Sequence, residues 1–260
     1  MNETNGLSLN EHVEALKEHG MTILENVIPQ TLIDTIKTDI KSYFSDSNNL
    51  CQGYRVANQS IKPNGFNYKE FSSCSKIFET KELLDVLFKI TDNKLRWLHH
   101  SDVHLNFVGA KGWHSDSQLK KNSHIFTDVN VNTEDEEYQA YRLAIYLTDH
   151  TDEEGCLYVK LGTHKGENYG EYHVDAKPGD IIIFNAKLRH MGGTSNKNER
   201  MALFAGFGLD NEHSIVHSKS AIQRQMNQNL EKTYQLSDHL TTLFDRLNIK
   251  HDVGPWNYQI

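Results

Sequence analysis

The segment KPGDIIIFNAKLRHMGGTSNKNERMALFAGFGL, residues 177–209, contains two apolar runs separated by a polar, glycine-containing turn. Each run is short and β-rich, and PGD and GGTSNKN are typical turn sequences. Similar short runs occur upstream in KLRWLHHSDVHLNFV (94–108), YRLAIYLTD (141–149), GCLYVKLG (155–162) and EYHVDA (171–176). Because no long helix separates these runs, the pattern predicts an antiparallel barrel or sandwich over residues 95–210.

Helical patterns flank this β-rich region. Residues 8–18 predict a helix that Ser8 or Asn10 can cap, and residues 29–44 place Pro29 at the start of an amphipathic helix. MTILENVI, between them, alternates like a strand, and KELLDVLFKIT predicts a further helix. Residues 45–75 are polar and irregular, which is typical of a lid or binding loop. Residues 219–248 return to a helical pattern.

We therefore expect one domain over residues 1–260. It would comprise helical support and a lid loop in 1–94, a β core in 95–210 and a helical segment in 211–260.

Composition excludes several classes of function. The formal net charge of -8 disfavours a nucleic-acid partner, and no apolar run approaches the length of a membrane span. The three cysteines form no CxxC pair, which disfavours a disulfide framework or a thiolate zinc site. With no signal-peptide pattern at the start of the sequence, we expect a cytoplasmic protein.

A candidate metal site begins in KGWHSDSQ, residues 111–118. Residues i and i+2 of an extended segment project to one side, so His114 and Asp116 can reach the same ion. A second histidine would complete the ligand set of non-haem Fe(II) oxygenases, and His190 follows a buried strand. Ten residues later Arg200 opens the next strand, where we expect it beside His190 on the neighbouring strand. Its guanidinium can bind one end of a dicarboxylate such as 2-oxoglutarate.

These segments resemble the phytanoyl-CoA dioxygenase family of Fe(II)/2-oxoglutarate oxygenases over most of the chain. EHVEALKEHGMTILENVIPQTLIDTIKTDI resembles the amino-terminal helix-strand-helix, and GWHSD resembles the Trp-His-x-Asp ligand stretch. YRLAIYLTDHTDEEGCLYVKLGTHK resembles the strand pair that ends in Pro-Gly-Ser-His, and KPGDIIIFNAKLRHMGGTSNKNER resembles the distal-histidine strand, turn and arginine. The resemblance implies a double-stranded β-helix, or jelly roll, with His114, Asp116 and His190 as iron ligands and Arg200 as the cosubstrate anchor.

The chain departs from the family pattern at three positions. Leu161 stands at the family's Pro and Thr163 at its Ser. Ala202 stands where related oxygenases often have a Ser, which removes one hydrogen bond to the cosubstrate and keeps the Arg200 salt bridge. The carboxylate of Asp116 is retained, whereas halogenating relatives replace it with Ala or Gly, so the sequence favours oxygenation.

The resemblance implies an enzyme that uses Fe(II), 2-oxoglutarate and O2 and releases succinate and CO2. We expect hydroxylation of a small polar metabolite, amino-acid-like or a natural-product intermediate, by a monomer or homodimer with no nucleic-acid or membrane partner. Desaturation or cyclisation can follow the same hydrogen abstraction. A cupin-type metal protein without this chemistry, a halogenase and a protein demethylase are the alternatives.

Other residues have both functional and structural interpretations. Asn106 has two interpretations, a pocket residue that contacts cosubstrate or substrate, and a hydrogen-bonded strand residue. Arg142 shares strand phase with Ala144 and Tyr146, so it either faces a cavity and binds a substrate anion or points outward.

Further substrate candidates are Trp113, Gln118 and, in the expected lid, Tyr54, Arg55 and Asn58. Trp113 is also a packing candidate, and Gln118 is also a loop-capping candidate. His164 competes with His190 as distal ligand, although a turn histidine is the preferred interpretation. His99, His100 and His104 are interpreted as packing or surface histidines.

Overall fold

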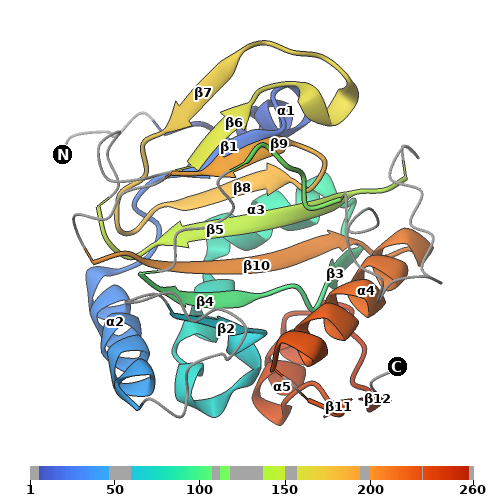
Figure 1. The fold of residues 1–260 in the computed structure, drawn as a ribbon. Coiled ribbons are helices and arrows are strands. Elements are labelled where there is room, and N and C mark those ends of the chain that lie inside the picture. Colours follow the sequence, from blue (N-terminus) through green and yellow to red (C-terminus); the bar gives the residue numbers. More distant parts are fainter. Residues whose placement is uncertain are drawn as a thin grey trace.

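Two antiparallel sheets face each other in the computed structural model, which describes residues 6–46, 60–106, 112–117, 137–149, 157–193, 199–229 and 231–257 (Figure 1). The larger sheet has the order β1-β8-β5-β10-β4-β2, with β3 also paired to β10, and the smaller has the order β7-β6-β9. The strands are β1 Met21–Leu24, β2 Ser60–Pro63, β3 Leu95–Trp97, β4 Asp102–Leu105, β5 Ala140–Tyr146, β6 Leu157–Lys160, β7 Glu171–Val174, β8 Ile181–Asn185, β9 Arg189–Gly192 and β10 Met201–Leu209. The antiparallel architecture predicted from the sequence is confirmed.

The first three helices begin and end close to their predicted positions, whereas the helical pattern predicted over 219–248 forms two helices, the first of which begins seven residues earlier, at Glu212. The helices are α1 Leu9–Glu18, α2 Gln30–Ser45, α3 Lys81–Ile90, α4 Glu212–Asn229 and α5 Asp238–Arg246. Ser8 and Glu11 form the capping box of α1. A small pair, β11 Thr233–Tyr234 and β12 Trp256–Asn257, lies beside the C-terminal helices. None of the helices in the described ranges is long and apolar enough to cross a membrane.

Residues 60–75 correct the prediction of a long irregular loop. β2 pairs with β4 at the edge of the large sheet, and 3-10 helices follow at Gly65–Asn67, Lys69–Phe71 and Cys74–Glu79. Phe66 and Phe71 are fully buried in the main core. Their burial is decided by contacts with distant segments, which outweigh the weak local propensity of a polar sequence. The predicted lid residues Tyr54, Arg55 and Asn58 lie outside the described residues.

The sheets also extend beyond the predicted core limits of 95–210. β1 and β2 belong to the segment that the sequence assigned to helical support, yet β1 pairs with β8 and β2 with β4. Both pairings are non-local, so neither could be read from a local pattern.

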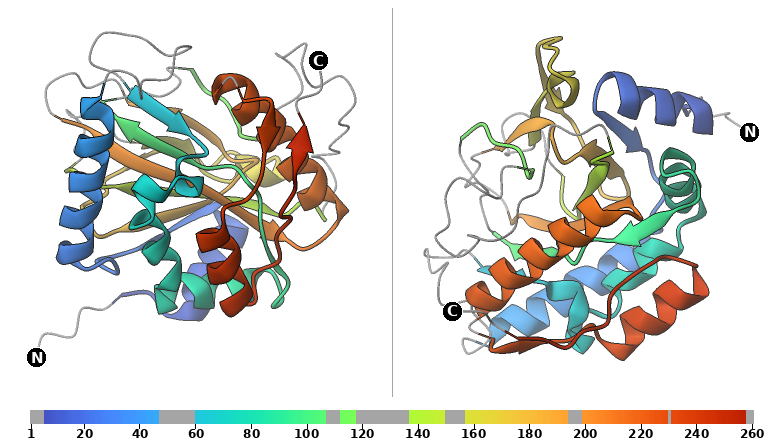
Figure 2. Two further views of the ribbon diagram at one scale, coloured as in Figure 1. Left: turned by 90° about the horizontal axis from the view of Figure 1, so that it is seen from below. Right: turned by 90° about the vertical axis from the view of Figure 1, so that its right-hand side faces the viewer.

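Strand alternation separates two cores on the faces of the large sheet. In β5, Leu143 and Ile145 pack with the helices, whereas Ala144 and Tyr146 face the smaller sheet. Helices α2, α3 and α5 cover the outer face, and the smaller sheet stands on the opposite side (Figure 2). The space between the sheets is therefore where the inward-facing polar residues of β4 and β5 meet Arg200, which directly precedes β10.

Buried histidines link the stability of the fold to pH. His99 and His217 are fully buried, and burial lowers the pKa of each to about 3. Between this value and the ordinary pKa of about 6.5, the unfolded chain binds more protons than the folded chain. Stability is therefore fully present above about pH 6.5 and is lost as the pH falls below it, by at most about 1.4 kcal/mol per pH unit for each histidine.

We predict that His99→Gln reduces the slope of unfolding free energy against pH between pH 7 and pH 5. The measurement is urea unfolding in EDTA at several pH values for the wild type and the variant. The slope is compared, and not the free energy itself, because the substitution also changes packing, which shifts the unfolding free energy equally at every pH. Equal slopes would show that His99 does not resist protonation in the folded state.

Candidate active site

The backbones of His114 and His190 pair across the two segments that carry them. His114 N donates to His190 O at 3.0 Å, and His190 N donates to His114 O at 2.8 Å. This isolated antiparallel bridge attaches the segment 112–117 to β9 and brings the two ring centroids within 4.3 Å. Two residues that are far apart in the sequence therefore present their imidazoles side by side.

Each imidazole is fixed in one tautomer by a carbonyl two residues earlier. His114 Nδ1 lies 2.9 Å from Gly112 O, and His190 Nδ1 lies 2.9 Å from Leu188 O. A carbonyl oxygen only accepts hydrogen bonds, so each Nδ1 carries the proton and each neutral ring keeps a lone pair on Nε2. Backbone hydrogen bonds of this kind orient metal-binding histidines.

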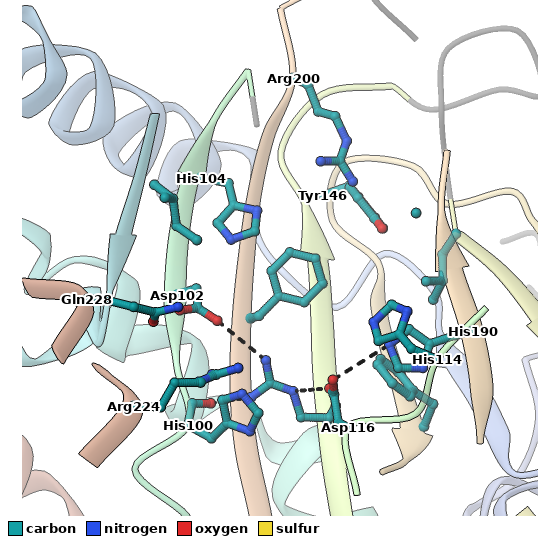
Figure 3. A pocket seen from close by; sticks show the side chains of 16 residues that line it. His100, Asp102, His104, His114, Asp116, Tyr146, His190, Arg200, Arg224 and Gln228 are labelled. Carbon is teal, nitrogen blue, oxygen red and sulfur yellow. Dashed lines mark hydrogen bonds and ion pairs between the residues drawn. The ribbon is translucent and has the colours of Figure 1, made fainter. Parts of the chain in front are cut away.

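Asp116 completes a cluster in which one donor atom from each residue lies within 4.8 Å of the others. Its Oδ1 is 3.8 Å from His190 Nε2 (Figure 3). Burial raises the pKa of Asp116, but Arg142 and the two histidines outweigh it and hold the pKa at about 2. Burial lowers the pKa of His190, so its ring is neutral at pH 7. Two imidazole Nε2 atoms and one carboxylate suit a non-haem Fe(II) ion, so the donor set fits the metal that the sequence implies.

Arg142 lies behind Asp116 and is 4% exposed. Its Nε is 2.9 Å from Asp116 Oδ2, its Nη2 is 3.7 Å from Asp102 Oδ2, and its Nη1 donates to the carbonyl of His100. Of the two sequence interpretations, the cavity-facing one agrees with the structure. However, the donors of Arg142 engage groups of the protein, and this favours a role in positioning Asp116.

Gly206 makes room for one of these contacts. It is paired with Arg142 across β10 and β5, and a Cβ atom there would lie 3.3 Å from the His100 carbonyl oxygen. The absent side chain therefore lets the His100 backbone approach the Arg142 guanidinium closely.

A cavity of about 380 Å³ opens in front of the cluster. It is lined by Ile61, His100, Asp102, His104, His114, Asp116, Arg142, Tyr146, Leu157, Phe184, His190, Gly192, Arg200, Phe204, Arg224 and Gln228. Figure 3 shows the His-Asp-His cluster on one side, Arg200 at one end, and Asp102, Arg224 and Gln228 on the far side. The strand register accounts for this lining, because His104, Ala202 and Tyr146 lie side by side on one face.

Arg200 lines the cavity, but it does not lie beside His190 on a neighbouring strand as expected. The β10 strand that follows Arg200 pairs with β3, β4 and β5 of the large sheet, whereas β9 pairs with β6 of the smaller sheet. Arg200 therefore reaches the cavity from the opposite sheet. The ten-residue spacing allowed the chain to cross between sheets, which a local turn rule does not anticipate.

Asn106 holds the backbone on which Arg200 is mounted. Arg200 N donates to Asn106 Oδ1 at 2.9 Å, and Asn106 N donates to Arg200 O at 2.6 Å. Asn106 has a left-handed backbone conformation with φ 55°, which turns it out of the phase of His104. Arg200 is 4% exposed, with its guanidinium carbon 5.3 Å from the centre of the Tyr146 ring. Of the two interpretations of Asn106 made from the sequence, the structural one, a hydrogen-bonded residue, accounts for these contacts.

The remaining candidates lie in different places. Trp113 is half-buried with Lys160 Nζ 4.5 Å from its ring centre, and it does not line the cavity. His164 lies in a turn where its Nε2 is 2.9 Å from Lys17 O, in agreement with the turn interpretation. Gln118 lies outside the described residues.

Sequence reasoning missed Arg224 and Gln228, and interpreted His100 and His104 as packing or surface residues. The missed pair lies four residues apart on α4, and this spacing places both on one helical face. The four-residue spacing is visible in the sequence. The helix is polar, however, so the sequence does not reveal that this face packs against the cavity.

Comparison with known proteins agrees with this site. The phytanoyl-CoA dioxygenase (PhyH) family matches residues 16–202. The chain belongs to this family. Membership confirms the enzyme class expected from the sequence, a 2-oxoglutarate-dependent non-haem iron oxygenase. The dioxygenase OlcK of Penicillium canescens is 24% identical over 212 residues, which cover 74% of this chain and 67% of that protein.

Solved structures share the jelly-roll fold at low sequence identity. The α-ketoglutarate-dependent epimerase SnoN from nogalamycin biosynthesis has a TM-score of 0.59 at 12% identity, covering 77% of this chain and 82% of its own. EctD from S. alaskensis, solved with 2-oxoglutarate and 5-hydroxyectoine, has a TM-score of 0.59 at 17% identity, with coverages of 80% and 78%. HygX from Streptomyces hygroscopicus, solved with nickel and 2-oxoglutarate, has a TM-score of 0.57 at 13% identity, with coverages of 79% and 88%.

We predict that Arg142→Gln lowers the free energy of unfolding of the metal-free protein by about 3–5 kcal/mol, because buried Asp116 loses the cation that lies 2.9 Å from it. Asp116→Asn in the same chain should restore part of the loss by removing that carboxylate charge. A double-mutant cycle of urea unfolding in EDTA measures the coupling, which we expect to be at least about 1 kcal/mol. Additive effects of the two substitutions would contradict the positioning role.

Proposed function

We propose that this protein hydroxylates an unactivated C–H bond of a small polar molecule, with iron held by His114, Asp116 and His190. The observation that carries the proposal is the three-residue cluster, in which both histidines keep Nε2 available and the carboxylate is ionised. A purely structural role would not require both histidines to keep the Nε2 lone pair free beside the same carboxylate.

Iron and 2-oxoglutarate supply, when bound, the oxidising chemistry that divides O2 between the substrate and succinate and releases CO2. The residues of the protein orient the three candidate ligands. Gly112 O and Leu188 O orient the rings, and Arg142 holds the Asp116 oxygen that faces away from His190. Phe184 lies 4.8 Å from the His190 ring, centre to centre, and shields it on its inner side.

Arg200 binds the far carboxylate of 2-oxoglutarate in this proposal. It is a buried cation that lines the same cavity as the cluster, and a buried guanidinium favours a bidentate carboxylate partner. Asn106 fixes its backbone and Tyr146 lies against its guanidinium, so the anchor is prearranged. Ala202 adds no hydroxyl at this end of the cavity.

The size and polarity of the cavity support a small polar substrate. About 380 Å³ is at the low end of ligand pockets and must hold the cosubstrate as well. The relative EctD was solved with 5-hydroxyectoine, a hydroxylated small molecule by its name, which supports hydroxylation as the outcome proposed here.

The metal ligands are tested by anaerobic addition of Fe(II) and then 2-oxoglutarate while the visible absorption is recorded. We expect the wild type to develop the weak charge-transfer band of a chelated keto acid. His190→Ala should abolish the band, because it removes one of the three donors. His164→Ala is the matched control and should keep it. A band that survives in His190→Ala and is lost in His164→Ala would reverse the choice of distal ligand.

The cosubstrate anchor is tested by Arg200→Gln. We expect 2-oxoglutarate affinity to fall at least about 30-fold, because a buried carboxylate would lose its charged partner. The measurement is the same spectroscopic titration, with Fe(II) affinity followed separately. Arg246→Gln, which removes an exposed arginine paired with Glu79, is the control. Unchanged 2-oxoglutarate affinity in Arg200→Gln would place the anchor elsewhere.

A further inference from the structure

The far wall of the cavity carries a cation that the proposed chemistry does not use. Arg224 extends from α4 into the cavity, opposite the His-Asp-His cluster (Figure 3). Its Nε is buried and has no hydrogen-bond partner among the described residues. Arg224 also forms no ion pair with a carboxylate of the described residues, although Asp102 lies near enough for the Arg224 charge to lower its pKa. A guanidinium in this position favours an anionic ligand.

Among the described residues that line the cavity, the formal charges leave one positive charge in excess. The lining contains three arginines, Arg142, Arg200 and Arg224, and two aspartates, Asp102 and Asp116. Burial lowers the pKa of His100 and His104, so these two rings add no charge at pH 7, and His114 and His190 would bind the metal through Nε2. A divalent iron and a 2-oxoglutarate dianion cancel each other, so the excess persists in the loaded site.

The other two arginines already have partners or a role. Arg142 contacts Asp116, Asp102 and the His100 carbonyl. Arg200 has the position and burial expected of the cosubstrate anchor. Arg224 is therefore the arginine left for a second anion, and the geometry of the cavity places that anion across from the metal cluster.

Two other residues of this wall lie near Arg224, Gln228 and the hydrogen-bonded ring of His100. Gln228 lies one helical turn further along α4 and also lines the cavity. The ring of His100 is held from behind, because its Nδ1 is 3.2 Å from His217 Nε2, and His217 Nδ1 is 2.8 Å from the Tyr138 hydroxyl. Groups fixed in this way form a prearranged binding surface.

We propose that Arg224, with Gln228 beside it, binds a carboxylate of the primary substrate, so that the substrate is a small carboxylic acid. The inference rests on the proposed function for the position of the cosubstrate. A single excess charge matches a monoanionic carboxylate better than a phosphate ester, which carries about -1.5 to -2 at neutral pH. The cavity size, shared with 2-oxoglutarate, favours the smaller group as well.

The test uses matched pairs of small probes on the protein loaded anaerobically with Fe(II) and 2-oxoglutarate. Acetate, propionate and benzoate are compared with acetamide, propionamide and benzamide, and with methyl phosphate, at constant ionic strength. Apparent affinities come from the rise in Tm with probe concentration. In the wild type we expect the carboxylates to bind about 10- to 100-fold more tightly than their amides.

Arg224→Gln should abolish this preference, and the remote control Arg246→Gln should keep it. Equal binding of carboxylates and amides in the wild type, or a preference that survives in Arg224→Gln, overturns the proposal. Tighter binding of methyl phosphate that depends on Arg224 also overturns it and indicates a phosphate subsite.

Failure of the proposed function is recognised separately. The charge-transfer band is recorded before any probe is added, and its absence counts against the iron and 2-oxoglutarate site alone. The probe comparison is then repeated on metal-free Arg200→Gln protein, where carboxylate binding can be attributed to Arg224. If the Arg200→Gln/Arg224→Gln double variant no longer prefers carboxylates to amides, the result supports the Arg224 subsite. If the preference persists in the double variant, the proposal is overturned.

Discussion

The reciprocal backbone pairing of His114 and His190 is the constraint on which the site depends. Two hydrogen bonds attach a short segment to the end of β9 and set the spacing of the imidazoles. The local carbonyls of Gly112 and Leu188 then set the tautomers. Because backbone groups make all four contacts, the geometry needs no side chain beyond the ligands themselves. The side chain of Asp116 alone depends on a distant partner, Arg142.

That dependence connects the metal cluster to the opposite wall of the cavity. Arg142 joins Asp116 to Asp102 and to the backbone of His100, so a row of charged groups crosses the cavity floor. Buried charges are costly unless they are paired, and in this row Arg224 forms no ion pair with a described residue, although its charge lowers the pKa of Asp102. The same electrostatic arrangement can therefore orient the metal ligand and select the substrate.

The sequence predicted the strands and helices well where they carry a clear amphipathic or apolar pattern. The segment 177–209 has apolar runs and turn residues that a strand-turn-strand unit requires, and the helix over 29–44 has a regular apolar stripe. Residues 60–75 were misjudged because their strand and 3-10 helices depend on contacts with β4 and the main core. The position of Arg200 was also misjudged, since the chain crosses between sheets within the ten residues that follow His190.

The candidate ligands could be predicted from the sequence alone, because the side chains of His114, Asp116, His190 and Arg200 offer the donors that iron and a dicarboxylate require. The inward orientation of Arg142 was one of two alternatives, since strand phase does not reveal which face is the interior. The contribution of α4 was decided only by the tertiary structure. Arg224 and Gln228 reach the cavity because α4 packs against β2 of the large sheet, and contacts between segments so far apart in the sequence leave no local periodic signal.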